Sequence, residues 1–213
     1  DCRASVFLQD DFNEIVGENR EITFEDLVSD RRTLEELNAL ADLAEELSRK
    51  DNNIPVVALS DGSLILWRLA ERFEFDYEKK FVQRYIETLK RFQQCQVATA
   101  GYISNSNSRE VVNLVQLVQQ TSQNNRSPII GSEPFLTDTE LFSRILKKGT
   151  RSTLFHSQSR IVKEKYTEQK ISYFYLHGGN EIAKVEIPHW IAIDKARVDE
   201  IAAYCFQQAQ IGG

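Results

Sequence analysis

The stretch from Val56 to Trp67, VVALSDGSLILW, constrains the fold most, because two apolar runs flank one polar centre, Ser60-Asp61-Gly62-Ser63. Neither run alternates clearly with polar residues, a pattern typical of strands that are buried on both faces. Asp61 is the only ionisable residue in the stretch. A carboxylate within a buried sheet must be paired, protonated or bound to a cation, because leaving it bare costs several kcal/mol. Asp61 is therefore a candidate site residue.

The same residues also fit a structural role. Asp-Gly between two apolar runs is typical of a tight hairpin turn, in which Gly62 supplies a positive φ and Asp61 caps its own backbone. On local sequence alone the hairpin is the better of the two interpretations. The choice between them depends on the rest of the chain.

Composition limits the classes of partner. The chain has 213 residues, 41% hydrophobic and 27% charged, and we expect it to form a single domain over residues 1–213. Its formal net charge of −6 and its pI of about 5.2 argue against a general binder of polyanions. Any nucleic-acid contact must come from local basic residues or from metal ions. The basic residues between Lys147 and Lys165 are candidates for DNA contacts, and a solvated surface explains them equally well.

Three cysteines, Cys2, Cys95 and Cys205, are far apart and have no CxxC spacing, which indicates reduced thiols and a cytoplasmic protein. No apolar run is long enough to span a membrane and no signal peptide is visible, so no membrane association is expected. The chain begins at Asp1 and contains no Met. We expect it to be an excerpt that is cut at both ends.

The hydrophobic periodicity predicts an α/β fold in which helices pack on a mixed sheet. Helices are expected over residues 31–50, 76–94, 109–120, 137–149 and 195–210, and strands, besides the opening stretch, over 96–104, 171–177 and 181–187. Gly178-Gly179-Asn180 is a typical hairpin turn between the last two strands. Residues alternate in the last strand, so one of its faces is expected to be partly exposed.

The helix expected over residues 31–50 carries two candidate acids, Glu35 and Glu36. Glu36 lies one and two turns before apolar positions, on the flank of the apolar stripe, and is expected to point toward the sheet. Thr33-x-x-Glu36 also fits an N-terminal capping box, in which Glu36 would be structural.

Common catalytic motifs are absent. The sequence contains no GxxxxGK[ST], GxGxxG, GxSxG or HExxH pattern, which argues against a nucleotide-binding core, a serine hydrolase and a zinc site. Carboxylate chemistry remains. Asp61 and Glu36 would form a pair of hard oxygen ligands for Mg²⁺ or Mn²⁺, an arrangement used in phosphodiester hydrolysis.

Several blocks occur in a specific order over roughly residues 30–213. They are RRTLEELNALADLAEEL (31–47), ALSDGSLILW (58–67), AGYIS with REVVNLV (100–115), ELFSRIL and RSTLF (140–155) and FYLHGGNEIAKVEIPHWIA (174–192). A lone DGS would carry no weight, but this ordered set resembles the NurA family of DNA repair nucleases.

The resemblance implies an RNase H-like fold and Mn²⁺-dependent (or Mg²⁺-dependent) cleavage of DNA, as a 5′→3′ exonuclease and single-strand endonuclease in end resection at double-strand breaks. It further implies a homodimer and a HerA-like hexameric ATPase as partner. Asp61 matches the metal-binding Asp of the DGSL motif. Glu36 best matches the acidic residue on the preceding helix, with Glu35 as the alternate, and Tyr175 matches a Tyr associated with the site. A strand aromatic in the core explains Tyr175 equally well.

The chain also departs from this family pattern. It has no earlier DGS strand before Asp61, and the His and Asp expected on a C-terminal strand would lie beyond Gly213. We therefore expect only part of a metal site in this chain. The second hypothesis is a catalytically silent RNase H-like interaction module that docks on a DNA-translocating ATPase.

Overall fold

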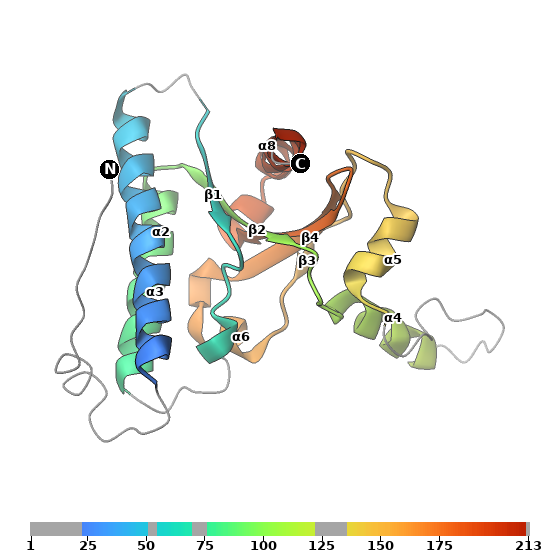
Figure 1. Cartoon of the computed structure of the whole chain (residues 1–213), viewed down its shortest axis with the longest axis horizontal. Helices are drawn as coiled ribbons and strands as arrows, with labels where there is room; N and C mark the ends of the chain where they lie inside the picture. Colours follow the sequence, from blue (N-terminus) through green and yellow to red (C-terminus); the bar gives the residue numbers. More distant parts are fainter. Residues whose placement is uncertain (1–22, 51–54, 70–75, 122–135, 212–213) are drawn as a thin grey trace.

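The computed structural model describes residues 23–50, 55–69, 76–121 and 136–211 (Figure 1). One five-stranded sheet has the order β1-β2-β5-β4-β3. Its strands are β1 (Val57–Asp61), β2 (Ala98–Ser104), β3 (Phe155–His156), β4 (Ile171–His177) and β5 (Ile182–Pro188). β1 runs parallel to β2, and the other neighbours are antiparallel. The predicted α/β fold with a mixed sheet is confirmed.

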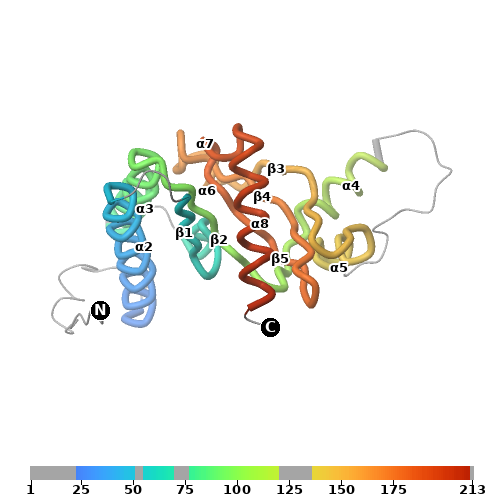
Figure 2. The backbone as a smooth tube through the Cα atoms, turned by 90° about the horizontal axis from the view of Figure 1, so that it is seen from above, coloured from blue at the N-terminus to red at the C-terminus, as the bar shows by residue number. Residues whose placement is uncertain are grey.

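Helices lie on both faces of the sheet. They are α2 (Phe24–Lys50), α3 (Asp76–Gln94), α4 (Glu110–Thr121), α5 (Asp138–Ile145), α6 (Arg160–Lys165), α7 (His189–Ala192) and α8 (Lys195–Ile211), with short 3₁₀ turns η1 (Trp67–Leu69) and η2 (Thr167–Gln169). Figures 1 and 2 show α7 and α8 over one face, while the α2/α3 and α4/α5 pairs lie at opposite ends of the molecule. Three buried apolar clusters fill the spaces between these layers.

Helix α2 begins at Phe24, seven residues before the predicted start at residue 31. Thr23 and Asp26 cap it reciprocally, since the Asp26 amide donates to Thr23 Oγ1 at 3.1 Å and the Thr23 amide donates to Asp26 Oδ2 at 3.0 Å. Thr33 therefore lies inside the helix, where its hydroxyl donates to the Ser29 carbonyl at 2.9 Å. The capping box expected from Thr33 to Glu36 is wrong.

Strand β5 is buried along its whole length, contrary to the partly exposed face predicted for it. Lys184 and Glu186 are 2% and 0% exposed. The residues two apart on a strand share a face, so these opposite charges lie side by side, 3.5 Å apart, and compensate each other where water is excluded.

Helix α5 confirms one predicted boundary and corrects another. The Thr137 side chain accepts from the Glu140 amide and the Glu140 carboxylate accepts from the Thr137 amide, which forms a capping box at the predicted start. The helix ends at Ile145, whose side chain is 59% exposed, and not at Gly149. Residue Leu146 is already extended, so the chain leaves the helix before the glycine.

Candidate functional site

The DGS turn follows β1 directly and leads the chain out of the sheet. Gly62 has φ +116°, a value that L side chains rarely adopt, and its amide donates to the Tyr102 carbonyl at 2.8 Å. The next residues, Leu64 and Ile65, are buried at 0% and 2% exposure but form no strand, and η1 begins at Trp67. The predicted second strand and the hairpin are therefore both wrong, because β1 pairs with β2 and not with the residues that follow the turn.

Asp61 is the last residue of β1, and its side chain is exposed. Among the described residues β1 pairs only with β2, at one end of the strand order. The buried environment expected for the Asp61 carboxylate is wrong. Because β1 ends at this residue, the carboxylate reaches solvent without the cost of burying a charge.

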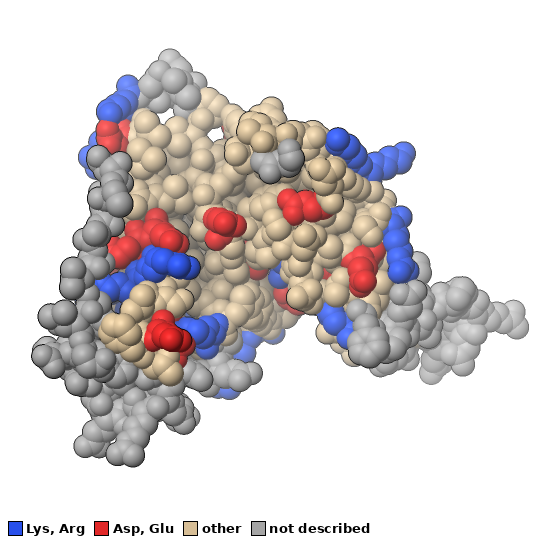
Figure 3. All heavy atoms as spheres, in the orientation of Figure 1, with Lys and Arg blue, Asp and Glu red and all other residues tan. Residues whose placement is uncertain are grey.

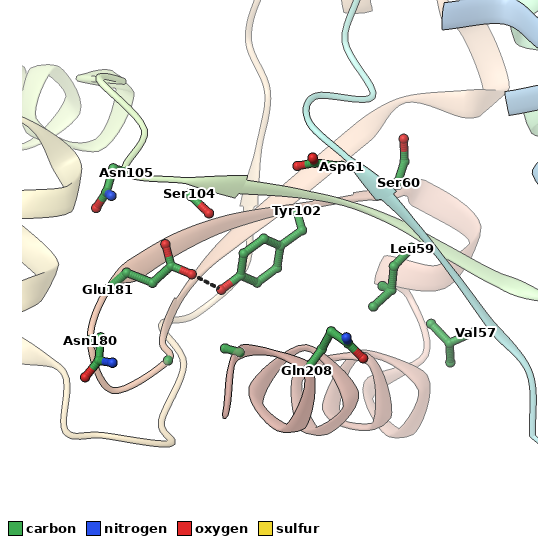
Figure 4. A pocket seen from close by; sticks show the side chains of 12 residues that line it. Val57, Leu59, Ser60, Asp61, Tyr102, Ser104, Asn105, Asn180, Glu181 and Gln208 are labelled. Carbon is green, nitrogen blue, oxygen red and sulfur yellow. Dashed lines mark hydrogen bonds between the residues drawn. The ribbon is translucent and has the colours of Figure 1, made fainter. Parts of the chain in front are cut away.

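Asp61 opens onto a groove of about 980 Å³ between the ends of β1 and β2, the β4–β5 turn and helix α8. Figure 4 shows Asp61 at the end of β1 and Glu181 beside Tyr102. The groove is lined by Val57, Leu59, Ser60, Asp61, Tyr102, Ser104, Asn105, Gly178, Asn180, Glu181, Gln208 and Ala209. Polar side chains thus gather where four separate parts of the chain meet.

Glu181 is the second carboxylate of this groove. The Tyr102 hydroxyl donates to Glu181 Oε1 at 2.6 Å, which fixes the carboxylate at the start of β5. Burial, followed by this contact with Glu181, raises the pKa of Tyr102, so the phenol remains a hydrogen-bond donor. Sequence reasoning missed Glu181, because an acid after a Gly-Gly-Asn turn looks like an ordinary hairpin residue.

The donor set of the groove fits a hard divalent cation. Asp61 and Glu181 offer carboxylate oxygens, and Ser104, Asn105 and Asn180 offer neutral oxygens, which are the ligand types that Mg²⁺ and Mn²⁺ take. The described lining contains no Lys, Arg or His, so its charge is negative. Within the described ranges, no group of three or more His, Cys, Asp or Glu residues could hold a metal. The two carboxylates of the described residues would thus provide only part of the ligands that such a cation needs.

Glu36 lies elsewhere and does not line the groove. Its side chain is 69% exposed and pairs with Arg32 on the same helix at 3.5 Å. Helix α2 turns Leu34, Leu37 and Ala41 inward, which places both Glu35 and Glu36 on its exposed side. The predicted orientation of Glu36 toward the sheet is wrong.

Tyr175 is wholly buried on β4, and its hydroxyl donates to Asp138 Oδ2 at 2.7 Å. Its ring stacks on Phe142 of α5, with the centroids 4.5 Å apart. Burial, and then the neighbouring Asp138, raises the pKa of Tyr175. Tyr175 does not line the groove that contains Asp61. These contacts support the core aromatic interpretation of Tyr175.

Asp138 is the centre of this buried polar cluster. Its side chain is 0% exposed and accepts hydrogen bonds from the Val112 amide at 2.8 Å, the Val111 amide at 3.2 Å and the Ser108 hydroxyl at 3.2 Å, besides that from Tyr175. It joins the start of α5 to the first turn of α4, whose free amides it satisfies.

Replacing Tyr175 by Phe is expected to lower the free energy of unfolding by about 1 to 3 kcal/mol, because the Asp138 carboxyl loses a buried donor. If the chain has the nuclease activity that the family resemblance implies, its rate per folded molecule is expected to stay within about twofold, since a catalytic role would cost tenfold for every 1.36 kcal/mol of lost transition-state stabilisation. Urea denaturation and cleavage rates corrected for the folded fraction measure the two effects. A large loss of rate in a fully folded Tyr175→Phe variant would restore the catalytic assignment.

The surface carries both charge signs. Figure 3 shows Asp and Glu side chains spread over the middle of one face, with Lys and Arg gathered mostly toward its two sides. Lys147, Lys148 and Lys163 are exposed, as the predicted DNA contacts require, and so are many other surface charges.

None of the helices in the described ranges combines the length and the hydropathy that crossing a membrane requires.

The mixed sheet and the helices on both faces define an α/β domain, and Asp61 and Glu181 line an acidic groove at one edge of it. Comparison with protein families matches residues 3–208 to the NurA domain. The match covers nearly the whole chain, and the chain belongs to the NurA family, which indicates a nuclease. Neither the curated proteins nor the solved structures that were compared with the chain include a match.

Proposed function

We propose that this chain is the cleavage domain of a divalent-metal-dependent deoxyribonuclease, with Mn²⁺ or Mg²⁺ held at the groove beside Asp61. The observation that carries the proposal is the lining of that groove, where Asp61 and Glu181 are accompanied by neutral oxygens and by no cationic side chain. Such a surface repels a DNA backbone unless cations offset its charge. Membership of the NurA family supports the same class of activity.

The roles of the residues follow from their positions. Asp61 would hold a cation through its exposed carboxylate at the end of β1, and Glu181 would do so through the carboxylate that the Tyr102 hydroxyl orients. Asn105 and Asn180 donate hydrogen bonds to phosphate oxygens through their side-chain amides. A bound Mn²⁺ or Mg²⁺ supplies charge that polarises the phosphate and lowers the pKa of an attacking water.

The proposal also covers the fold family, the oligomeric state, the partner protein and the mode of DNA cleavage. We propose an RNase H-like fold, supported by the mixed sheet in which the antiparallel strands β3, β4 and β5 adjoin the parallel pair β1 and β2. We also propose a cytoplasmic homodimer that works with a HerA-like hexameric ATPase in end resection, with 5′→3′ exonuclease and single-strand endonuclease activity. Family membership supports these properties. Cys95 and Cys205 are free thiols, while Cys2 lies outside the described residues.

Removing the metal tests the proposal directly. DNA with a labelled 5′ end should be cut in Mn²⁺, and excess EDTA should abolish the cutting, because the groove then lacks the charge that its carboxylates cannot provide. Restoring Mn²⁺ should restore the rate, and Ca²⁺ in place of Mn²⁺ serves as a control for nonspecific stabilisation. Equal cleavage with and without EDTA would refute a metal-dependent nuclease.

The alternative is a catalytically silent module of the same fold that binds a DNA-translocating ATPase. One observation favours it: the described ranges contain no cluster of three or more metal-ligand side chains. On this alternative the chain binds the ATPase but releases no nucleotides in Mn²⁺. The cleavage assay therefore separates the two functions.

A further inference from the structure

Glu186 of β5 holds the DGS turn against the sheet through hydrogen bonds to the residues that follow Asp61. Glu186 Oε2 accepts a hydrogen bond from the Ser63 hydroxyl at 2.7 Å and another from the Leu64 amide at 2.9 Å. The Glu186 side chain is 0% exposed, and water cannot substitute for these contacts. The residues that follow Asp61 are thus held by a carboxylate more than a hundred positions away in the sequence.

The sheet leaves room for this attachment at Gly101. Gly101 pairs with Ser60 of β1 on one side and with Glu186 of β5 on the other. A Cβ on Gly101 would lie 2.5 Å from the Gly62 carbonyl oxygen and 3.1 Å from the Leu64 amide nitrogen. Because Gly101 has no side chain, the turn packs directly on the backbone of β2, and this close approach allows Ser63 to reach Glu186.

The charge of Glu186 is compensated inside the protein. Lys184 Nζ lies 3.5 Å from Glu186 Oε1 and 2.8 Å from Glu110 Oε1 at the start of α4. The same ammonium group lies 4.2 Å from the Tyr173 ring centroid and 5.8 Å from that of Trp67, positions typical of cation–π contacts. Trp67 also donates through Nε1 to Ser63 Oγ at 3.0 Å. Glu186, Lys184 and Trp67 thus form one network around the turn.

We infer that Glu186 is a positioning residue for Asp61: it holds the DGS turn through Ser63 and Leu64 and so fixes the direction of the Asp61 carboxylate at the groove. The two carboxylates lie on different faces of the sheet. Asp61 pairs with Tyr102 on the face that also carries Leu59, whereas Glu186 pairs with Gly101 on the other face. Glu186 therefore acts through the turn and does not line the groove. The inference rests on the proposed function, in which Asp61 binds the cation.

The test compares Ser63→Ala and Glu186→Gln with Asp138→Asn. Ser63→Ala removes the hydroxyl that donates to Glu186 and accepts from the Ile65 amide and Trp67 Nε1, and it leaves all buried charges in place. Glu186→Gln keeps an acceptor but removes the charge. Asp138→Asn perturbs an equally buried carboxyl away from the turn. Partners of metal ligands are typically worth about 10- to 100-fold in metal affinity. We expect Glu186→Gln to raise the Mn²⁺ concentration for half-maximal cleavage by about tenfold and Ser63→Ala by a smaller factor, with Asp138→Asn unchanged.

Hydrogen exchange of the Leu64 amide gives a readout that does not depend on activity. In Glu186→Gln and Ser63→Ala this amide should exchange faster than in the native chain, while the Tyr175 amide, bonded to the Ser152 hydroxyl, should not. Unchanged exchange at Leu64, or an unchanged requirement for Mn²⁺ despite faster exchange, would overturn the inference alone. A native chain that does not cleave DNA in Mn²⁺ would overturn the proposed function and the inference with it.

Discussion

Replacing Asp61 by Asn is expected to reduce Mn²⁺-dependent DNA cleavage at least about 100-fold, which corresponds to about 2.7 kcal/mol of transition-state stabilisation. The amide keeps the shape of the side chain and removes the charge that attracts the cation. Asp61 is exposed and, within the described part of the chain, makes no buried contact that the substitution would break, so the free energy of unfolding should change by less than about 0.5 kcal/mol. Initial cleavage rates at saturating DNA, with urea denaturation of the same samples, measure both quantities.

Two matched variants sharpen this experiment. Glu36→Gln removes an exposed carboxylate from α2, and its cleavage rate should stay within about twofold of the native chain, because Glu36 pairs only weakly with Arg32 in solvent. Glu181→Gln removes the second carboxylate of the groove and should lower the rate to an intermediate level. Full activity of Asp61→Asn would remove Asp61 from the site, and a large loss in Glu36→Gln would return Glu36 to it.

Replacing Asp138 by Ala is expected to lower the free energy of unfolding by about 3 to 5 kcal/mol, the largest effect on stability that we expect for a single residue. The substitution leaves the Val111 and Val112 amides and the Tyr175 hydroxyl buried without an acceptor. For a marginally stable domain this is a large part of the total. The midpoint of urea denaturation measures the change.

Asp199→Ala is the control for that prediction. The Asp199 side chain is 50% exposed and pairs with Arg151 at 2.6 Å, so Asp199→Ala also removes the hydrogen bonds of a carboxylate, but at the surface. Its removal should cost no more than about 1 kcal/mol. A loss in Asp138→Ala as small as that in Asp199→Ala would show that the buried cluster does not stabilise the junction of α4, α5 and β4.

Local sequence patterns predicted the helices and strands whose structure is determined by residues close together in the chain. The helix predicted over residues 76–94 occurs as α3, because its apolar stripe repeats at helical spacing and packs against α2. The hairpin of β4 and β5 occurs within one residue of the predicted bounds, since Gly178, Gly179 and Asn180 meet the turn requirements between two β-prone runs. In each case residues close in the chain determine the structure.

The site depends instead on contacts between distant residues. The run Leu64 to Trp67 has the composition of a strand, but its neighbours are Glu186 and Tyr166, whose hydroxyl accepts from the Leu66 amide at 2.9 Å and donates to the Leu64 carbonyl at 2.9 Å. These hydrogen bonds replace strand pairing, and no local sequence pattern predicts them. Glu181 was missed for the same reason, because its place beside Tyr102 arises only when β2 and β5 pair.

The network of Glu110, Lys184 and Glu186 also limits how the sequence can change. Lys184 is 3% exposed at its side chain and pairs with both acids, so losing it leaves the Glu186 carboxylate, which is 0% exposed, without an opposite charge in a region that water does not reach. Substitutions at residues coupled in this way have effects that do not add. These positions should therefore covary among relatives of this chain, either keeping all three charges or replacing them together with uncharged residues.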